Sequence, residues 1–248
     1  MTKIIAGIDE AGRGAVIGPM VIAGVAIDSK QQKKLKEIGV KDSKELTPQK
    51  REKLYKEIEK LAKNIIVIKV PACIINNYQS KNVNLDQIEA MKMANIIKII
   101  EADKIYVDSI EQNSNKFEKM IKSYLEKDYN LVVKNYLDEN IPVVSAASIV
   151  AKVERDKEIN DIKKEVNFDF GVGYSHDERT IKFIEHILLN ENSPPRYLRL
   201  KWETVKDVAK KLIEENKKIK PWVLKEVLGQ DSWQKKIKDF FTKTIIGE

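Results

Sequence analysis

The alternation of apolar and polar positions along the first part of the chain predicts two strands and then a helix. Runs rich in Ile and Val at 3–9 and 16–27, joined by a glycine-rich turn, are typical of paired strands. A charged stretch with helical spacing follows at 43–63. Thr47 stands at its N-cap position and Pro48 at the first helical position, a combination that favours helix initiation.

Further along the chain, short apolar runs alternate with segments of helical spacing. The expected strands are 64–70, 104–109 and 130–135, and the expected helices are 84–100, 114–127 and 145–166, the last with Ser145 as a candidate cap. A strand pair followed by strand–helix alternation predicts a mixed α/β sheet rather than a purely parallel one.

The last quarter of the chain has a different pattern. A loop is expected at 171–180, then a helix to about residue 189, and the proline-containing stretch at 190–197 is a clear break. Beyond it only helical patterns follow. The sequence therefore predicts an α/β domain over residues 1–190. It also predicts a C-terminal helical region over 191–248, packed on that domain and aiding substrate binding.

Composition excludes several classes of protein. The chain has 248 residues, 42% of them hydrophobic, which is enough for a substantial core. No apolar run approaches the roughly 18–20 residues of a membrane span, and the N-terminus lacks the pattern of a signal peptide. The single cysteine, Cys73, forms no internal disulfide, and no Cys/His metal spacing is present. We expect a soluble, cytoplasmic protein.

The net charge suits a polyanionic partner. It is +7, with an isoelectric point of about 9.1. From Lys201 to the end the chain has 12 lysines against 8 acidic residues, which predicts a basic C-terminal face. Solubility alone would explain the same charge, so composition leaves both interpretations open.

Four acidic residues stand out against their surroundings. Asp9 and Glu10 end the first strand directly, although two unpaired carboxylates there would repel each other and resist desolvation. Asp108 ends another expected strand, and Asp156 lies at the margin of the apolar face of the long helix. Individually they are explained by a loop, a turn or a solvated helix face. Together they would form an oxygen-only site suited to Mg²⁺ or Mn²⁺.

Several motifs resemble one known family. GIDEAGRGAVIGPMVIAGVAI at the N-terminus, KDSKELTPQKRE at 41–52, YVDS at 106–109 and SAASIVAKVERDKEI at 145–159 are similar to segments of ribonuclease HII, the type 2 ribonucleases H. GVGYSHDERT resembles the family's tyrosine-bearing loop, and PPRYLRLKWETV is like the segment that follows it in archaeal members. The match runs in order from residue 3 to about 206.

The resemblance implies a ribonuclease H-like fold, a mixed β-sheet flanked by helices. It implies that Asp9, Glu10, Asp108 and Asp156 are the catalytic residues and bind Mg²⁺ or Mn²⁺, with two ions when substrate is bound. The implied activity is endonucleolytic hydrolysis of RNA in RNA–DNA hybrids and cleavage 5′ of single ribonucleotides in duplex DNA. The products would be 3′-hydroxyl and 5′-phosphate ends, and the implied roles are DNA replication and ribonucleotide excision repair.

The resemblance also assigns substrate contacts. Gly12, Arg13 and Gly14, together with Tyr174, would read the ribose 2′-OH and the adjacent phosphate. The loop Asp42-Ser43-Lys44 would hold a phosphate through Ser43 and Lys44.

Other positions near these motifs remain ambiguous. Arg196 and Lys201 either touch the duplex backbone or are merely solvated. Ser175-His176 stands where archaeal members usually have Pro-Ser, so the local geometry of the tyrosine loop is open.

Two other functions fit parts of the pattern. A non-catalytic nucleic-acid binding module would be expected to have lost at least one of the four acids, and a nuclease for DNA alone would not need a motif that senses a 2′-OH. Type HIII relatives usually have an N-terminal extension and an altered Gly-Arg-Gly motif. The expected partners are RNA–DNA hybrid and ribonucleotide-containing DNA duplex, with no membrane. A monomer is expected, and association with a replication clamp remains open.

Overall fold

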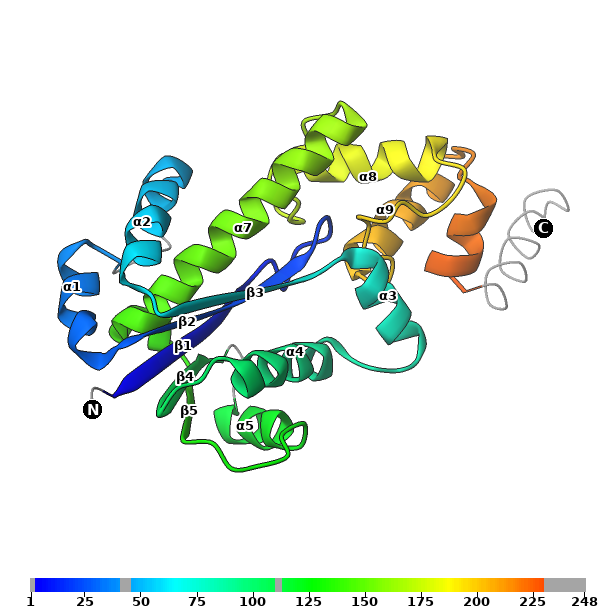
Figure 1. Ribbon diagram of the computed structural model, residues 1–248. Helices are drawn as coiled ribbons and strands as arrows, with labels where there is room; N and C mark the ends of the chain where they lie inside the picture. The colour runs from blue at the N-terminus through cyan, green and yellow to red at the C-terminus, as the bar shows by residue number, and fades with distance from the viewer. Residues whose placement is uncertain (1–2, 41–45, 110–112, 230–248) are drawn as a thin grey trace, which may run out of the picture. The chain divides into compact units, whose positions relative to one another are not determined.

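Five strands form one mixed sheet in a computed structural model that describes residues 3–40, 46–109 and 113–229 (Figure 1). The spatial order is β3-β2-β1-β4-β5. The bounds are β1 Ile4–Ala11, β2 Met20–Asp28, β3 Asn64–Val70, β4 Lys104–Asp108 and β5 Leu131–Lys134. β2 is antiparallel to both β1 and β3, whereas β1, β4 and β5 run parallel. This arrangement confirms the expected mixed α/β architecture.

The chain divides into two units. The first comprises Met1–Arg13 and Pro19–Asp161 and contains the sheet, and the second comprises Gly14–Gly18 and Ile162–Glu248. Residue 190, where a domain boundary is predicted, lies within the second unit.

Helices account for most of the remaining described residues. The first unit contains α1 Gln32–Glu37, α2 Pro48–Leu61, α3 Ala72–Ser80, α4 Leu85–Ile99, α5 Ser114–Lys122, α6 Leu137–Asn140 and α7 Pro142–Val166 as far as Asp161, besides a short 3₁₀ turn at Ser29–Gln31. The second unit contains the end of α7, α8 Glu178–Asn190, α9 Glu203–Glu214 and a π-helical segment at Val223–Val227. Within the described ranges, no helix is both long and apolar enough to cross a membrane.

Helices cover both faces of the sheet. A Cβ atom added to Gly7 would overlap the backbone of Val143 in α7, whereas one added to Gly24 would overlap the side chain of Ile96 in α4. Gly24 is paired with Ile8, the neighbour of Gly7, so the two glycines lie on opposite faces. α7 and α4 therefore pack against opposite faces of the sheet, as Figure 1 shows. Both glycines allow a helix to approach the strands closely.

The expected start of α2 is confirmed in detail. The side chain of Thr47 accepts a hydrogen bond from the backbone amide of Lys50, and Pro48 is the first helical residue. This interaction satisfies one of the amides that a helix N-terminus leaves unpaired.

Several element boundaries differ from the expectation. α5, for instance, ends at Lys122 rather than at residue 127. β2 begins at Met20 rather than 16, because the amides of Val16 and Ile17 bond to the carbonyl of Gly173 and Ile17 forms a bridge with Leu198. α7 begins at Pro142, and Ser145 lies within its first turn, where its hydroxyl donates to the carbonyl of Asp138. The short helices α1, α3 and α6 were not expected.

Candidate active site

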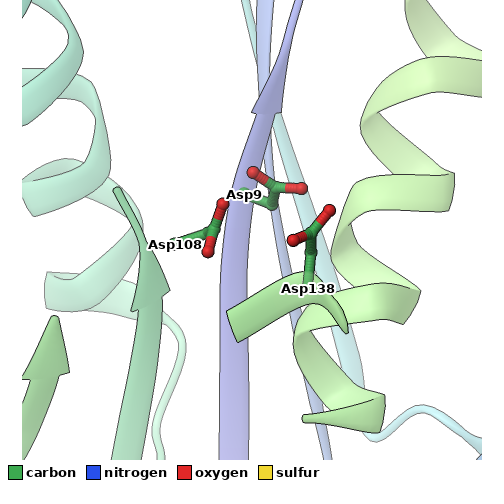
Figure 2. Close-up of side chains that lie close together, drawn as sticks. All are labelled: Asp9, Asp108 and Asp138. Atoms are coloured by element: carbon green, nitrogen blue, oxygen red, sulfur yellow. The ribbon is translucent and has the colours of Figure 1, made fainter. Parts of the chain in front are cut away.

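Three buried aspartates converge at one end of the sheet. Asp9 lies near the end of β1, Asp108 is the last residue of β4, and Asp138 lies in α6. Each contributes a carboxylate oxygen, and these three oxygens all lie within 4.8 Å of one another (Figure 2). The side chains are directed toward a common point, as a shared cation would require.

The sheet register brings Asp9 and Asp108 together. β1 and β4 are parallel neighbours, and their paired residues end with Ile8 opposite Val107. The next step along both strands is Asp9 and Asp108, and residues in register on parallel strands point to the same face. Both acids therefore end up side by side on one face of the sheet.

Asp138 reaches this point through a contact with Asp108. The backbone amide of Leu137 donates to Asp108 Oδ1 at 2.6 Å, which ties the start of α6 to the end of β4. Ser145 in α7 donates to the carbonyl of Asp138 at 2.5 Å. The backbone at residues 137 and 138 is therefore held by both neighbouring elements.

Burial and mutual repulsion raise the pKa values of these acids. Burial, followed by the charges of Asp9 and Asp138, raises the pKa of Asp108 to about 7. Burial also raises the pKa of Asp9, although Lys152 and a hydrogen bond from Ser148 act in the opposite direction. Without a cation, ionising both Asp9 and Asp108 is unfavourable. A bound divalent cation would offset this cost by attracting the negative charges.

Lys152 and Ser148 lie beside Asp9 on α7. The ammonium of Lys152 donates to Ser148 Oγ at 2.5 Å, and Ser148 is in turn hydrogen-bonded to Asp9. This chain of contacts orients the Asp9 carboxylate.

Glu10 points to the opposite face from Asp9 and is also buried, with 7% of its surface exposed. Burial raises its pKa well above the ordinary value, and the charges of Glu89, Asp9 and Asp108 raise it further. Its Oε2 atom has no hydrogen-bond partner among the described residues. A buried carboxylate oxygen without a protein partner fits a metal ligand, since such groups are otherwise paired.

Asp156 does not join this group. Its carboxylate accepts a hydrogen bond from Arg51 Nη2 at 2.7 Å, and its side chain is 37% exposed. It lies two helical turns beyond Ser148, which is a shift of roughly 12 Å along α7. The expectation that Asp156 converges with the other acids is therefore not met, and Asp138 is the acid found with Asp9 and Asp108 instead.

A signal for Asp138 was present in the sequence. It follows a short apolar run, the strand β5, by only a few residues, whereas Asp108 is the last residue of β4. Parallel strands present their carboxyl ends at the same edge, so an acid placed after β5 is brought near the ends of β1 and β4.

The first two residues of the Gly-Arg-Gly turn belong to the first unit. Gly12 has φ of +79°, and a Cβ there would overlap the side chain of Arg155, so only glycine fits without strain. Arg13 Nε donates to Glu89 Oε2 at 2.6 Å, and its Nη2 is paired with Asp86. Two acids of α4 thus fix the plane of the Arg13 guanidinium.

The other predicted substrate contacts are placed as follows. Tyr174 lies in a loop of the second unit, where its ring stacks on His176 with centroids 5.6 Å apart. Arg196 pairs with Glu165 at 2.5 Å. Ser43 and Lys44 lie outside the described residues.

Comparison with known proteins identifies the family. The model of the family described as ribonuclease HII matches residues 6–205. The chain belongs to the ribonuclease HII family.

Similar ribonucleases HII come from several archaea. The chain is 38% identical to the one from Thermococcus kodakarensis over 213 residues, covering 86% of this chain and 92% of the relative. It is 45% identical to that of Caldivirga maquilingensis over 207 residues, covering 83% and 95%. The crystal structure of ribonuclease H2 from Pyrococcus horikoshii matches with a TM-score of 0.77 and 36% identity, covering 85% of this chain and 99% of that one.

Two further solved structures contain a bound partner or ion. One is a complex of PCNA with ribonuclease HII from Archaeoglobus fulgidus, with a TM-score of 0.70 and 35% identity, covering 80% of this chain and 95% of that one. The other, Bst-RNase HIII in complex with Mn²⁺, is 18% identical with a TM-score of 0.71 over 84% of this chain and 70% of that one, and it shows a shared fold.

As a ribonuclease HII, this protein is an endonuclease that hydrolyses RNA in RNA–DNA hybrids. Its family is metal-dependent, and the buried aspartates suit that requirement.

Proposed function

We propose that this ribonuclease HII also cuts duplex DNA on the 5′ side of a single embedded ribonucleotide, leaving 3′-hydroxyl and 5′-phosphate ends. The proposed role is removal of ribonucleotides from DNA during replication and repair. The observation that carries the proposed chemistry is the convergence of Asp9, Asp108 and Asp138 within 4.8 Å at the ends of two parallel strands and a neighbouring helix.

Four carboxylates would hold the metal ions. They are Asp9, Asp108 and Asp138, which converge, and Glu10, which lies outside that group but whose pKa responds to the charges of Asp9 and Asp108. Asp138 takes the role first expected for Asp156. Mg²⁺ or Mn²⁺ suits a site made only of carboxylate oxygens. When bound, two such ions would activate the attacking water and stabilise the leaving oxygen.

The protein's own contribution is the placement of these acids before substrate arrives. Asp108 is fixed by Leu137 and Asp9 by Ser148, so little rearrangement is needed on binding. The buried surroundings strengthen the electrostatic interactions of whatever binds there.

Recognition of the ribonucleotide is assigned to two loops. Gly12, Arg13 and Gly14 would approach the 2′-OH and its phosphate from the first loop, and Tyr174 would pack on the sugar from the other. Ser43 and Lys44 would bind a further phosphate. The fixed plane of Arg13 supports this assignment, because oriented donors discriminate between ribose and deoxyribose better than mobile charges do.

A replication clamp is the proposed protein partner. A relative from Archaeoglobus fulgidus is found in complex with PCNA. In this chain, Trp233, Ile237, Phe240 and Phe241 follow helical spacing beyond the described residues. Apolar residues in this spacing are typical of segments that bind a hydrophobic groove.

The test uses three duplexes: DNA with one ribonucleotide, RNA–DNA hybrid, and DNA alone. Cleavage of the first two in Mg²⁺ or Mn²⁺, and of none without metal, is the expected result. The product ends identify the cut position. Cleavage of the hybrid without cleavage at the single ribonucleotide would refute the proposed specificity, and cleavage of all-DNA duplex would refute ribose recognition.

A further inference from the structure

The segment Gly14–Gly18 directly continues the Gly-Arg-Gly turn, yet it belongs to the second unit. The backbone amides of Val16 and Ile17 both donate to the carbonyl of Gly173, at 2.8 and 3.1 Å. Gly173 directly precedes Tyr174. Within this unit, the residues that follow the turn are therefore tied to the base of the tyrosine loop.

Residues 197–199 form further backbone contacts with the segment Gly14–Gly18. Ile17 bridges Leu198, and the amide of Gly18 donates to the carbonyl of Tyr197 at 2.9 Å. The amide of Arg199 donates to the carbonyl of Val16 at 3.0 Å. Residues 16–18 are thus fixed on both sides, whereas Gly14 lies at the end of the segment, where these backbone interactions do not reach.

The packing around Gly14 does not explain why glycine is needed there. Its φ lies outside the left-handed region, and no heavy atom of the described residues comes within 4 Å of an added Cβ. Gly12, in contrast, has a positive φ, and an added Cβ there would overlap Arg155. A glycine that is open on this side lets a ligand approach the backbone closely, but it is also the residue with the most conformational freedom.

Two side chains of the second unit restrain this segment at its two ends. Trp202 Nε1 donates to the carbonyl of Gly14 at 3.3 Å, and Arg199 Nε donates to the carbonyl of Gly18 at 3.1 Å. The guanidinium of Arg199 lies over the Trp202 ring, 4.8 Å from its centroid. Arg199 has no exposed surface, so it provides a fixed base on which the indole packs.

We propose that Trp202, supported by Arg199, is a positioning residue that sets the selectivity for ribose by fixing the Gly14 carbonyl. The inference rests on the proposed recognition of a ribonucleotide by the Gly-Arg-Gly turn. Distinguishing a 2′-OH from a hydrogen requires polar backbone groups held in place before binding. Gly14 is too flexible to hold its own carbonyl in place. The indole N–H of Trp202 restrains that carbonyl from outside the turn.

The chain offers a matched control for this proposal. Trp222 also belongs to the second unit, and its Nε1 donates to the carbonyl of Glu191 at 2.8 Å. Trp202→Phe and Trp222→Phe each remove one indole N–H and keep an aromatic ring. Only Trp202→Phe removes the hydrogen bond to the Gly14 carbonyl.

The experiment measures kcat and KM on duplex DNA with one ribonucleotide, together with affinity for all-DNA duplex and for Mn²⁺. Trp202→Phe is expected to raise KM for the ribonucleotide substrate by roughly threefold to tenfold, the loss expected for one hydrogen bond. Its kcat, its affinity for all-DNA duplex and its affinity for Mn²⁺ should stay within about twofold of wild type. Trp222→Phe should leave all four quantities unchanged.

Several results would overturn the proposal. Equal KM values for the two variants would show that the Trp202 N–H does not position the turn. Equal weakening on all-DNA duplex would make Trp202 a general duplex contact. A wild-type protein inactive at a single ribonucleotide would remove the proposed function and this inference together. Should Trp202→Phe not fold, Trp202→His, which keeps a ring N–H, should fold and retain a lower KM than Trp202→Ala.

Discussion

Asp108 accepts a hydrogen bond from the backbone amide of Leu137 at 2.6 Å, and this contact joins two of the acids in the active site. It places the start of α6 against the end of β4, so that Asp138, the residue after Leu137, faces Asp108. Asp108 is thus a candidate metal ligand and also positions the backbone that carries Asp138. Its removal should disturb the site beyond the loss of a single charge.

The identity of the fourth carboxylate is directly testable. Asp138→Asn should reduce cleavage of RNA–DNA hybrid by more than about 100-fold, because even residues behind a metal ligand commonly contribute 10–100-fold. Asp156→Asn should retain most activity and lose at most about 1 kcal/mol of stability, since its pair with Arg51 is partly exposed. Paired kinetics and urea unfolding of both variants check this. An inactive but folded Asp156→Asn protein would restore the original assignment.

The metal-free protein should become less stable as pH rises from about 4 to 7. Asp108 has an ordinary pKa of 3.8 that is raised to about 7, and Glu89 is raised from 4.5 to about 7. In this window the folded state binds more protons than the unfolded state, so the free energy of unfolding falls as pH rises. Thermal melts in EDTA across the pH range measure the effect.

Added Mg²⁺ should reverse this loss, because the ion binds the ionised acids of the folded state. The gain in Tm on adding Mg²⁺ should therefore be larger at pH 8 than at pH 5. Asp108→Asn should flatten the metal-free profile. Metal-free stability that increases steadily from pH 5 to pH 8 would contradict the predicted protonation of these groups.

The two glycines of the turn should respond differently to alanine. Gly12→Ala places a methyl group against Arg155 at positive φ, and we expect a loss of about 1–3 kcal/mol in stability. Gly14→Ala should fold with stability within about 1 kcal/mol of wild type, because the structure leaves room for a Cβ. Its cleavage at a single ribonucleotide should nevertheless fall. A fully active Gly14→Ala protein would mean that no ligand approaches this residue closely.

The active-site acids were predictable to different degrees. Asp9 and Asp108 each end an apolar run, and parallel pairing of those runs is enough to bring them together. Asp138 was missed because α6 has only four residues, too few for a periodic pattern, and Tyr136 before it adopts a left-handed conformation. The resemblance of SAASIVAKVERDKEI to the family implies Asp156 as the fourth acid instead.

The assignment of Gly14–Gly18 to the second unit could not be predicted from local sequence. VIGPMVIAGVAI reads as one continuous strand, but its first residues pair with residues near 173 and 198. Such pairing depends on residues more than 150 positions away, and hydrophobic spacing carries no information about it.

The final prediction concerns the pair formed by Arg13 and Glu89. Glu89 is only 2% exposed, and Arg13 provides a cation in direct contact with it. Arg13→Met would leave the buried carboxylate without its hydrogen-bonding cation, which should cost on the order of 1–3 kcal/mol at pH 8. At pH 5 the cost should be smaller, because the pKa of Glu89 is about 7 and the group is then protonated.

The double variant Arg13→Met/Glu89→Gln separates the pair's contribution to stability from its contribution to recognition. Removing the Glu89 charge as well should recover most of the stability lost at pH 8, since no unpaired buried charge remains. It should not recover cleavage at a single ribonucleotide, because the guanidinium proposed to read the ribose is still absent. Urea unfolding at both pH values, combined with kcat/KM on the ribonucleotide duplex, gives the comparison. A double variant no more stable than Arg13→Met at pH 8 would show that Glu89 does not depend on Arg13. Recovered cleavage would show instead that Arg13 serves only to neutralise Glu89.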